Sequence, residues 1–421
     1  MQVAYLFQSI NTNLSESKAP QLHILYTIRG LQESGHQVSL LSLQSQRRVI
    51  FTDSITAITD GKILNRHYGK VSISNLRGFK LLESGIRKIQ YKLNVPYFAL
   101  FDNFRMFDAC IQNINGYDLI HERYNVHSLG GALASRRLNI PYVLEVNADP
   151  ISEYEFLDLP LSPLKRLQIK CEIYISAKTA SKIICVSSQL KDFISSNWHV
   201  DAKKIAVLPN AANMNSFDQE YDKKKIRHQL GLMDEPVIMF VGGFYPWQDL
   251  NLLVDSFARV LKNNPLAKLV LVGDGKTKPD IEKKINADRL HHAVIFTGRV
   301  DHKNIPVMLA IADIAVAPNI SFFEGHGGSP LKIFEYMASG KAIVATKNGQ
   351  VKEIICSGED GLLVEPSDVV GFTKALDTLL ANPTLREKLG RAAYQRVCNN
   401  FTLKHYTNRL EYIYRDVLNI Q

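Results

Sequence analysis

The sequence predicts an α/β fold in which two doubly wound domains face each other across a cleft. Its 421 residues are too many for one hydrophobic core. Short apolar runs alternate with amphipathic helical segments, which is the pattern of βαβ units around a parallel sheet. The segment LPNAANMNSF (208–217) follows a strand with a Pro-Asn turn and so marks a boundary. We expect domains over 1–210 and 211–400, followed by a C-terminal helix over 401–421 that packs back toward the first domain.

The second domain shows this alternation most regularly, from Pro236 onward. Its predicted strands are PVIMFVGGF, AKLVLVGDG, AVIFTGRV, DIAVAPN, KAIVATKNG and GLLVEP. One helical segment separates each strand from the next, beginning with DLNLLVDSFARVLKNN. Because ligands of such sheets bind outside the carboxyl ends of the strands, the loops that follow these strands are the candidate binding loops.

The first domain repeats the pattern less regularly. Its predicted strands are QVAYLFQS, HQVSLLSLQ, YDLIHERYN, IPYVLEVNA, SKIICVSSQ and KKIAVLPN. Residues 52–110 interrupt the alternation, and the sequence supports no complete assignment over 44–110.

One helix is nevertheless predicted inside that stretch. From Phe79 to Leu93, apolar residues recur at spacings of three and four, with basic residues among them: Lys80, Arg87, Lys88 and Lys92. Such a basic amphipathic helix either rests on an anionic membrane surface or packs against the core with a solvated basic side.

Composition narrows the class of protein. The chain is 46% hydrophobic and 22% charged, as in ordinary globular proteins, and its five cysteines form no Cys-x-x-Cys pair, which indicates a reduced, cytoplasmic location. We find no signal-peptide pattern and no apolar run of the roughly 20 residues that a membrane span needs. The net charge of +9 includes eight basic residues against one acid within 61–92. We interpret this patch as a solvated or membrane-facing surface, and nucleic acid is not an expected partner.

Several common cofactor and metal motifs are missing from the sequence. It contains no GxGxxG, which disfavours a dinucleotide oxidoreductase, and no GxxxxGK[ST], which disfavours a P-loop nucleotidase. It also contains no Asp-x-Asp pair and no His/Cys cluster with metal-ligand spacing. We therefore expect neither a cofactor nor a bound metal.

The stretch GGSPLKIFEYMASGKAIVA (327–345) carries the clearest chemical signal. Ser329 is a suitable helix N-cap, and Pro330 is a suitable first helical residue. Unpaired N–H groups at such a helix start favour an anion, and Lys332 in the first turn adds a full positive charge. Glu335, one turn later, can accept hydrogen bonds from ribose hydroxyls. A cation for a diphosphate and an anion for sugar hydroxyls together predict a nucleoside diphosphate. Ser-Pro-Leu-Lys also occurs at 162–165. The alternative explanation is therefore that this tetrapeptide only begins a helix and binds no ligand.

The same residues resemble a known family. PLKIFEYMASGKAIVA and GQVKEIICSGEDGLLVEP resemble the nucleotide-sugar-binding half of retaining glycosyltransferases of the GT-B fold, glycosyltransferase family 4 (group 1). The likeness extends to FVGGFYPWQDLNLLVDSF, LVLVGDG, IFTGRV and VLPNAANMNSF, and to YDLIHERYN, IPYVLEVNA and IICVSSQLKDF in the first half.

The resemblance implies two Rossmann-like domains, the second holding a UDP- or GDP-sugar and the first an acceptor. It implies a metal-independent, hexosyltransferase-type transfer to an acceptor hydroxyl with retention of configuration. The acceptor would be a glycan or a lipid-linked molecule in cell-surface polysaccharide or glycolipid synthesis. The enzyme would be cytoplasmic, with peripheral membrane contact on the cytoplasmic face.

Carried over residue by residue, the resemblance shows two departures in the second domain. Glu335 matches the second glutamate of the family's Glu-seven-residues-Glu motif, but the first position is Gly327, and Glu324 is the candidate replacement. The family's Arg and Lys after the first strand correspond to Gly243 and Gln248. Lys332 and Arg299 would then have to neutralise the diphosphate. The remaining donor-binding candidates are Gly328, Ser329, Leu331, Val300, Gly243 and Gly349.

The first domain supplies fewer candidates. Asn147 stands where many family members have a histidine near the sugar, and its amide could orient a hydroxyl. With Glu324 and Lys332 it completes the catalytic candidates. Glu122 and Arg123 are expected on the acceptor side of the cleft, the alternative being an ion pair that braces two loops.

Two other functions remain open on the sequence. One is a nucleotide-sugar epimerase of the same fold, which shares the donor site and needs no acceptor. The other is a catalytically weak nucleotide-sugar-binding assembly subunit, suggested by the departures at Gly243, Gln248 and Gly327.

Overall fold

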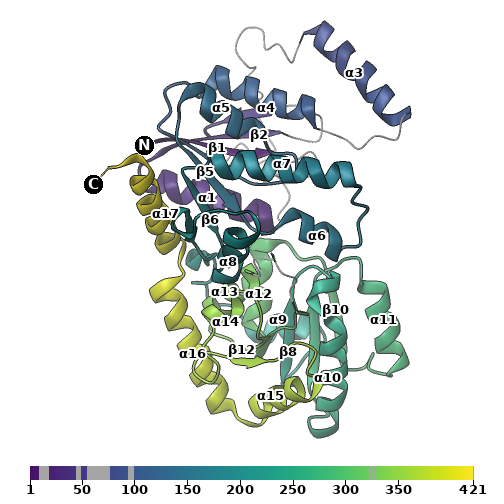
Figure 1. The fold of residues 1–421 in the computed structure, drawn as a ribbon. Coiled ribbons are helices and arrows are strands. Elements are labelled where there is room, and N and C mark those ends of the chain that lie inside the picture. Colours follow the sequence, from purple (N-terminus) through teal and green to yellow (C-terminus); the bar gives the residue numbers. More distant parts are fainter. Residues whose placement is uncertain are drawn as a thin grey trace. The chain divides into compact units, whose positions relative to one another are not determined.

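The computed structural model describes residues 1–8, 19–43, 49–54, 76–92, 99–321, 325 and 329–420. The chain forms two compact units. Unit 1 comprises residues 1–208, 323–327 and 407–421, and unit 2 comprises residues 209–322 and 328–406. Figure 1 follows the chain from purple to yellow.

Unit 1 is built on a seven-stranded sheet with the order β3-β2-β1-β4-β5-β6-β7. Its strands are β1 (Gln2–Gln8), β2 (Gln37–Leu43), β3 (Val49–Thr52), β4 (Leu119–Arg123), β5 (Tyr142–Val146), β6 (Lys182–Cys185) and β7 (Ile205–Val207). Only β3 pairs antiparallel, with β2. The six predicted strands of this half are confirmed, whereas β3 lies in the stretch that was left unassigned.

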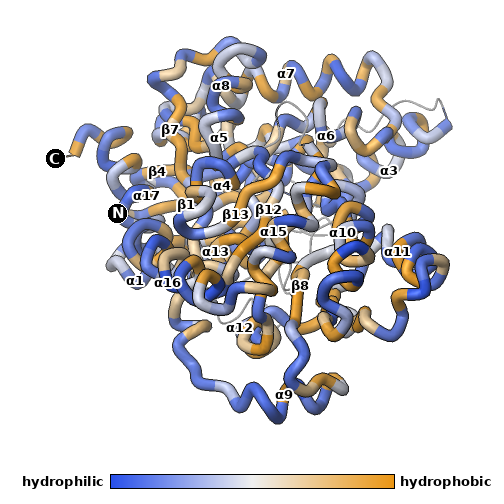
Figure 2. The backbone as a smooth tube through the Cα atoms, turned by 90° about the horizontal axis from the view of Figure 1, so that it is seen from below, coloured by the Kyte–Doolittle hydropathy of each residue, from blue (hydrophilic) through white to orange (hydrophobic). Residues whose placement is uncertain are grey.

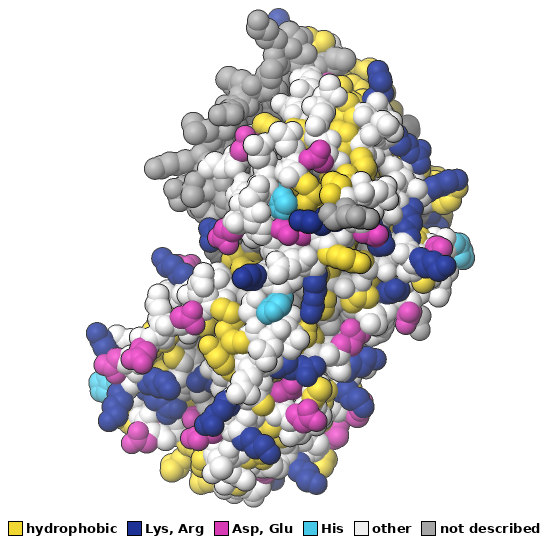
Figure 3. Space-filling view, turned by 90° about the vertical axis from the view of Figure 1, so that its left-hand side faces the viewer, with side chains coloured by type: hydrophobic (Ala, Val, Ile, Leu, Met, Phe, Trp, Pro, Cys, Tyr) yellow, Lys and Arg dark blue, Asp and Glu magenta, His cyan; other side chains and the backbone are white. Residues whose placement is uncertain are grey.

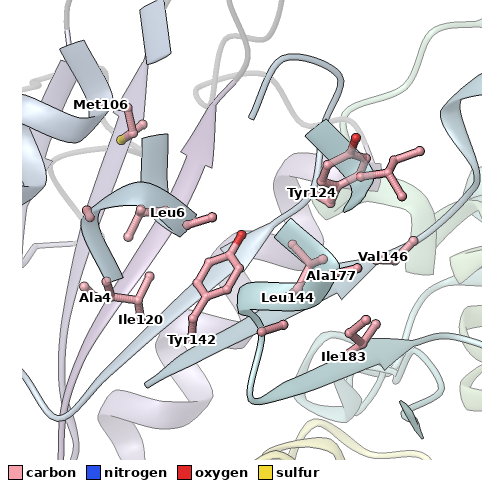
Figure 4. Close-up of a cluster of buried hydrophobic side chains, with 14 of the residues drawn as sticks. Ala4, Leu6, Met106, Ile120, Tyr124, Tyr142, Leu144, Val146, Ala177 and Ile183 are labelled. Carbon is pink, nitrogen blue, oxygen red and sulfur yellow. The ribbon is translucent and has the colours of Figure 1, made fainter. Parts of the chain in front are cut away.

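The helices of unit 1 connect and cover this sheet. They are α1 (Ala19–Glu33), α3 (Arg77–Lys92), α4 (Leu100–Asn113), α5 (Gly130–Leu138), α6 (Pro150–Phe156), α7 (Pro163–Thr179), α8 (Ser188–Asn197) and most of α17 (Leu403–Leu418). Figure 4 shows the core on one face of the sheet, where β1, β4, β5 and β6 contribute Ala4, Leu6, Ile120, Tyr142, Leu144, Val146 and Ile183.

Unit 2 has a six-stranded, wholly parallel sheet with the order β10-β9-β8-β11-β12-β13. The strands are β8 (Val237–Val241), β9 (Lys268–Val272), β10 (Val294–Gly298), β11 (Ile314–Ala317), β12 (Ala342–Thr346) and β13 (Leu362–Val364). All six coincide with the predicted ones. Figure 2 shows β8 and β12 as hydrophobic along their length, as expected for strands buried on both faces.

The helices of unit 2 lie between these strands in the chain and follow the last of them. They are α9 (Lys223–Gln229), α10 (Leu250–Asn263), α11 (Lys278–Ala287), α12 (Ile305–Ala310), α13 (Leu331–Ala338), α14 (Val351–Ile354), α15 (Val369–Ala381) and α16 (Pro383–Asn400). Single 3-10 turns occur in both units, at Ala202–Lys204, Met214–Ser216, Pro246–Gln248 and His302–Asn304.

The C-terminal part of α17 contacts several elements of unit 1. Glu411 pairs with His36 at 2.9 Å, and Asp416 pairs with Lys182 at 2.7 Å. Thr407 lies so close to α1 that a Cβ added at Gly30 would stand 2.2 Å from its Oγ1. Glycine at position 30 therefore permits the close approach of the two helices.

The predicted basic helix exists as α3, but it does not bury the stripe that the sequence suggested. Phe79 stacks on Phe104 of α4, with ring centroids 5.3 Å apart. Leu82 and Ile89, expected on the same apolar stripe, are 58% and 56% exposed. The alternative of a core-packed helix is therefore wrong for these positions, and Leu93 lies outside the described residues.

In the part of the chain that the structure describes, no helix is both long and apolar enough to cross a membrane. On the face drawn in Figure 3, Lys and Arg side chains are interspersed with Asp and Glu. Such mixing is typical of a solvated surface, since a nucleic-acid-binding face gathers basic residues together.

Candidate functional site

The strand order of unit 2 reverses between β8 and β11, because the chain leaves β8 toward β9 on one side and later adds β11 on the other. Ligands of doubly wound sheets bind at this switch point, outside the carboxyl ends of the strands. The loops after β8, β11 and β12 and the start of α13 meet there. This is the candidate site.

Hydrogen bonds hold the three loops together. The Asn319 backbone N–H donates to Thr346 Oγ1 at 2.8 Å, and its side-chain amide donates to the Trp247 carbonyl at 3.1 Å. The Asn348 amide donates to the Ile320 carbonyl at 2.8 Å. Asn319, Thr346 and Asn348 were not singled out from the sequence, although each lies in the last part of a predicted strand run. These bonds fix the loops after β8, β11 and β12 relative to one another, and the loop after β8 carries Gln248, which accepts a hydrogen bond from Lys332.

Lys332 is the buried cation of the site. Only 8% of the residue is exposed, and its Nζ donates to Gln248 Oε1 at 2.6 Å and lies 4.0 Å from the centroid of the Phe240 ring. Gly242 leaves room for it, because a Cβ there would stand 2.6 Å from Nζ. Burial lowers the pKa of Lys332 to about 7, opposed by the negative charge of Glu335. Among the described residues no carboxylate pairs directly with Lys332, and Glu335 acts on it only through its charge.

Glu335 lies one helical turn from Lys332 and is oriented by a histidine that sequence reasoning missed. His302 Nε2 lies 2.6 Å from Glu335 Oε1, and the two side chains are 21% and 13% exposed. Burial alone would lower the pKa of His302, but the hydrogen bond and charge of Glu335 raise it overall. His302 follows β10 in the loop GRVDHKN, so its position after a strand was the available signal.

Tyr336 fixes α13 against the strand ends. Its hydroxyl accepts a hydrogen bond from the Val241 N–H at 2.9 Å and donates to the Val316 carbonyl at 3.2 Å. The residue is fully buried. It anchors the helix that carries Lys332 and Glu335 to both strands of the switch point.

The predicted cap of α13 is wrong by one residue. Pro330 is the N-cap, no side chain caps the helix, and the Ser329 carbonyl accepts a hydrogen bond from the Asn210 amide at 2.8 Å. In the earlier copy of the tetrapeptide, Ser162 does cap α7 by accepting from the Lys165 N–H. The two copies of Ser-Pro-Leu-Lys therefore differ in structure: Ser162 caps its helix, whereas Ser329 does not cap α13.

The other residues predicted to bind the nucleotide-sugar donor differ in their burial and in the loops on which they lie. Gly243 packs on Tyr245, whose ring stacks on Trp247 with centroids 4.7 Å apart. Gly349 is buried in the loop after β12 with a φ of 48°, and Leu331 begins α13. Arg299 is exposed after β10, and its neighbour Val300 packs partly on the core. Glu324 and Gly328 lie outside the described residues.

Unit 1 contains a buried polar network centred on Glu145 of β5. Its carboxylate contacts Arg123, accepts from Tyr5 at 3.0 Å and lies 3.2 Å from His121 Nε2. The Asn147 amide donates to Glu145 Oε1 at 2.8 Å. Burial alone would raise the pKa of Glu145, but the charges of Arg123 and the neighbouring histidines hold it well below its usual value.

The network continues into two helices of the same unit. His23 of α1 lies 3.6 Å from Glu145, and burial lowers the pKa of this histidine to about 4, although the carboxylate raises it. His121 Nδ1 lies 2.5 Å from the Tyr414 hydroxyl of α17. Sequence reasoning missed Glu145. A charged residue inside the apolar run YVLEV was nevertheless a signal that this position has charged or polar partners.

Glu122 does not face an acceptor, contrary to expectation. It is fully buried on the opposite side of β4 from Arg123, and it accepts a hydrogen bond from Tyr142 at 2.6 Å. Burial raises its pKa to about 7, opposed by that hydrogen bond. Arg123 pairs with Glu145 and not with Glu122, because adjacent residues of a strand point to opposite faces.

Among the described residues, no group of three or more His, Cys, Asp or Glu side chains could hold a metal ion. Of the three charged side chains described here, Lys332 is buried, whereas Glu335 and His302 are partly exposed.

Two family models match the chain, and together they cover most of it. "Glycosyl transferases group 1" matches residues 222–396, and "Glycosyltransferase Family 4" matches residues 21–216. This chain belongs to the group 1 glycosyltransferases of glycosyltransferase family 4, which have the GT-B fold.

Individual proteins agree with this assignment. The chain is 24% identical over 293 residues to an alpha-D-kanosaminyltransferase of Streptomyces kanamyceticus, which covers 68% of this chain and 73% of that protein. It is 25% identical over 308 residues to a UDP-Gal:alpha-D-GlcNAc-diphosphoundecaprenol alpha-1,3-galactosyltransferase of Escherichia coli, covering 72% and 76%. Among solved structures, Anabaena Alr3699/HepE in complex with UDP is similar in fold, with a TM-score of 0.69, 19% identity and coverage of 99% and 100%.

Proposed function

We propose that this glycosyltransferase transfers a sugar from a UDP-sugar to a hydroxyl of a glycan or lipid-linked acceptor, with retention of configuration and without a metal. The observation that carries the proposal is Lys332, a buried cation without a carboxylate partner among the described residues, at the switch point of the sheet. Buried charges are normally paired, so this site is built to receive an anion.

Each neighbour of Lys332 has a role in this proposal. The diphosphate supplies the missing negative charge, and Gly242 allows the phosphates to approach Nζ closely. Glu335, oriented by His302, accepts hydrogen bonds from the ribose hydroxyls. Gln248 stands where the family places a lysine, and its carbonyl oxygen instead orients the Lys332 ammonium. The site thus keeps one cation near the diphosphate, and helix α13 supplies it.

UDP is favoured over GDP as the donor nucleotide by likeness alone. The similar Anabaena protein was solved with UDP, with UDP and glucose, and with UDP-glucose. The Escherichia coli relative uses a UDP-sugar and a lipid diphosphate acceptor by its name. In our proposal the departing phosphate takes the proton of the acceptor hydroxyl. Asn147, whose amide donates to Glu145, is the candidate residue of unit 1 for contact with the acceptor.

Release of UDP is the test of this function. We expect UDP to protect the protein thermally, by about 2.7 kcal/mol at 100 times its dissociation constant. With a UDP-hexose and a bacterial lipid extract as acceptor source, UDP should be released at the same rate with and without excess EDTA, because Lys332 and backbone N–H groups neutralise the diphosphate. Loss of activity in EDTA that manganese restores would contradict the metal-free site. Interconversion of UDP-sugars without UDP release would indicate an epimerase, and binding without either would indicate an assembly subunit.

The Glu335–His302 pair should control binding of the nucleoside part. Charge-assisted hydrogen bonds contribute roughly 1.5–3 kcal/mol. Glu335→Ala should therefore weaken uridine and UDP binding at least about tenfold, measured by calorimetry, while Glu359→Ala, an exposed control in the same unit, should leave both unchanged. Equal uridine affinity of Glu335→Ala and wild type would remove the ribose assignment.

The raised pKa of His302 adds a pH signature to that pair. The pair's contribution to stability is fully present below pH 6.5, the ordinary histidine value, and is lost as the pH rises through the raised pKa. The stability difference between wild type and His302→Gln should therefore shrink with rising pH above 6.5.

A further inference from the structure

The loop after β8 carries two aromatic side chains that stack on each other. The rings of Tyr245 and Trp247 have centroids 4.7 Å apart and an interplanar angle of 14°. Tyr245 is 41% exposed and Trp247 is partly exposed, although the next residue of the loop, Gln248, is buried against Lys332. The stack uses one face of each ring, so the pair leaves aromatic surface open to a ligand.

Gly243 permits this position of the Tyr245 ring. A Cβ at position 243 would stand 2.3 Å from Tyr245 Cε2 and 2.8 Å from its Cδ2. A Cβ at the neighbouring Gly242 would stand 2.6 Å from Lys332 Nζ. The Tyr245 ring and the Lys332 ammonium thus lie against consecutive residues of one backbone segment. A ligand whose anion is bound by Lys332 would therefore have its neighbouring group close to the aromatic pair.

Backbone hydrogen bonds fix the part of the loop that carries the pair. The Trp247 carbonyl accepts from the Ile320 N–H at 3.2 Å and from the Asn319 amide at 3.1 Å. The Gln248 N–H donates to the Tyr245 carbonyl at 2.9 Å. The two rings are therefore preorganised, and a ligand that stacks on them does not have to order the loop.

The groups of the candidate site follow one another along the edge of the sheet. His302 follows β10 and contacts Glu335. Gln248 follows β8 and contacts Lys332. Trp247 is bonded to the loop after β11, and β11 lies on the other side of β8 from β9 and β10. The proposed ribose contact and the aromatic pair therefore lie on opposite sides of the cation.

We propose that Tyr245 and Trp247 bind the sugar ring of the UDP-sugar donor by stacking. In a nucleotide sugar the diphosphate separates the ribose from the sugar, so the sugar that follows a diphosphate bound by Lys332 reaches the aromatic pair. The C–H groups on one face of a pyranose ring form an apolar surface, which packs against an aromatic ring. The inference rests on the proposed function and deepens it, because it names residues that hold the transferred sugar.

Affinities for UDP and for UDP-sugars separate the sugar contact from the nucleotide contacts. UDP, UDP-glucose, UDP-galactose and UDP-N-acetylglucosamine are each titrated by calorimetry into the full-length wild type, and the UDP-sugar that binds most tightly is used with the variants. We expect Tyr245→Ala to lower the ratio of UDP-sugar affinity to UDP affinity about fivefold, the size expected for loss of an aromatic contact.

Further variants distinguish stacking from a structural role of the loop. Tyr245→Phe keeps the ring and should keep the wild-type ratio, as should Tyr394→Ala, at a tyrosine of unit 2 with a similar exposure of 39%. Gly243→Ala would place a methyl group where the Tyr245 ring lies, so it should lower the ratio as Tyr245→Ala does. The double variant of Gly243→Ala and Tyr245→Ala should lose no more than either alone, because both changes remove the same stacked ring.

Trp247 gives a direct optical signal of the bound sugar. At saturation the UDP-sugar should change the protein fluorescence more than UDP does. This additional change should be absent in Trp247→Phe, in which Trp198 of unit 1 is the remaining tryptophan.

The affinity ratio separates stacking on a sugar from packing within the loop. A Tyr245→Ala protein that unfolds at a lower temperature but keeps the wild-type ratio would overturn the sugar contact, and if this variant does not fold, Gly243→Ala gives the same comparison. Wild type that binds UDP but none of the three UDP-sugars, or whose fluorescence responds equally to UDP and UDP-sugar, would overturn it as well. Wild type that does not bind UDP would overturn the donor assignment itself.

Discussion

Replacing Lys332 by methionine is expected to weaken UDP binding about a hundredfold and, at the same time, to stabilise the unliganded protein. The buried Lys332 ammonium contacts the Gln248 amide oxygen and the Phe240 ring, and no carboxylate among the described residues pairs with it. Its charge therefore destabilises the folded protein until an anion binds. Loss of one or two charge-assisted hydrogen bonds to phosphate, at roughly 1.5–3 kcal/mol each, accounts for the lost affinity. Calorimetry with UDP and thermal unfolding without it measure the two effects.

The pH dependence of stability gives an independent check on the same residue. Because the pKa of Lys332 is lowered to about 7, the folded protein binds fewer protons here than the unfolded chain between pH 7 and 10.5. The contribution of Lys332 to the free energy of unfolding of the wild type should therefore rise with pH across this window, by at most about 1.4 kcal/mol per pH unit. The methionine variant should lose that slope, and Lys374→Met, at an exposed position of α15, should keep it. Unchanged UDP affinity in Lys332→Met would refute the assignment of the cation.

Replacing Glu145 by glutamine is expected to have the largest effect on stability. The change keeps the shape of the side chain but leaves the Arg123 guanidinium and its buried surroundings without their counter-charge. Breaking a buried ion pair by removing one partner costs about 3–5 kcal/mol. For a unit of this size we expect the thermal midpoint of unit 1 to fall by roughly 6–20 °C.

The two tryptophans allow the two units to be followed separately. Trp198 lies in unit 1 and Trp247 in unit 2, so fluorescence in a Trp247→Phe background reports on unit 1. Since the pKa of Glu145 is held well below its usual value, the contribution of this carboxylate is present above pH 4.5 and lost as the pH falls through the lowered pKa. The difference between wild type and Glu145→Gln should therefore shrink in acid. A midpoint shift no larger than that of Glu33→Gln, an exposed control in unit 1, would show that the network does not stabilise the fold.

Hydrophobic periodicity was enough to predict most of both sheets. The runs that became β8 to β13 are apolar on both faces, and no tertiary contact is needed to recognise them. Strand β3 (Val49–Thr52) escaped prediction because it pairs antiparallel with β2 at the sheet edge, outside the alternation of strands and helices that located the other strands. Helix α3 was predicted from its spacing, but which of its residues are buried depends on α4, which the sequence did not place beside it.

The site shows the same division between local pattern and tertiary contact. The pairing of Lys332 with Glu335 on one helix follows from sequence spacing, and so does the position of that helix after a strand. That Lys332 is buried against Gln248 and Phe240, and that His302 orients Glu335, depends on contacts between residues that lie far apart in the chain.

The sequence by itself determined the fold class, the family and the residue types at the switch point, because these depend on local periodicity and on ordered motifs. Tertiary structure alone decided in which direction the pKa of each of two acids of the first half is shifted. Glu122 and Glu145 are both glutamates within predicted strands, yet Glu122 has a pKa raised to about 7 beside Tyr142, whereas Glu145 lies between Arg123 and two histidines. The face of the strand on which each residue stands, and the neighbours brought there by pairing of β4 with β5, set the direction of its pKa shift.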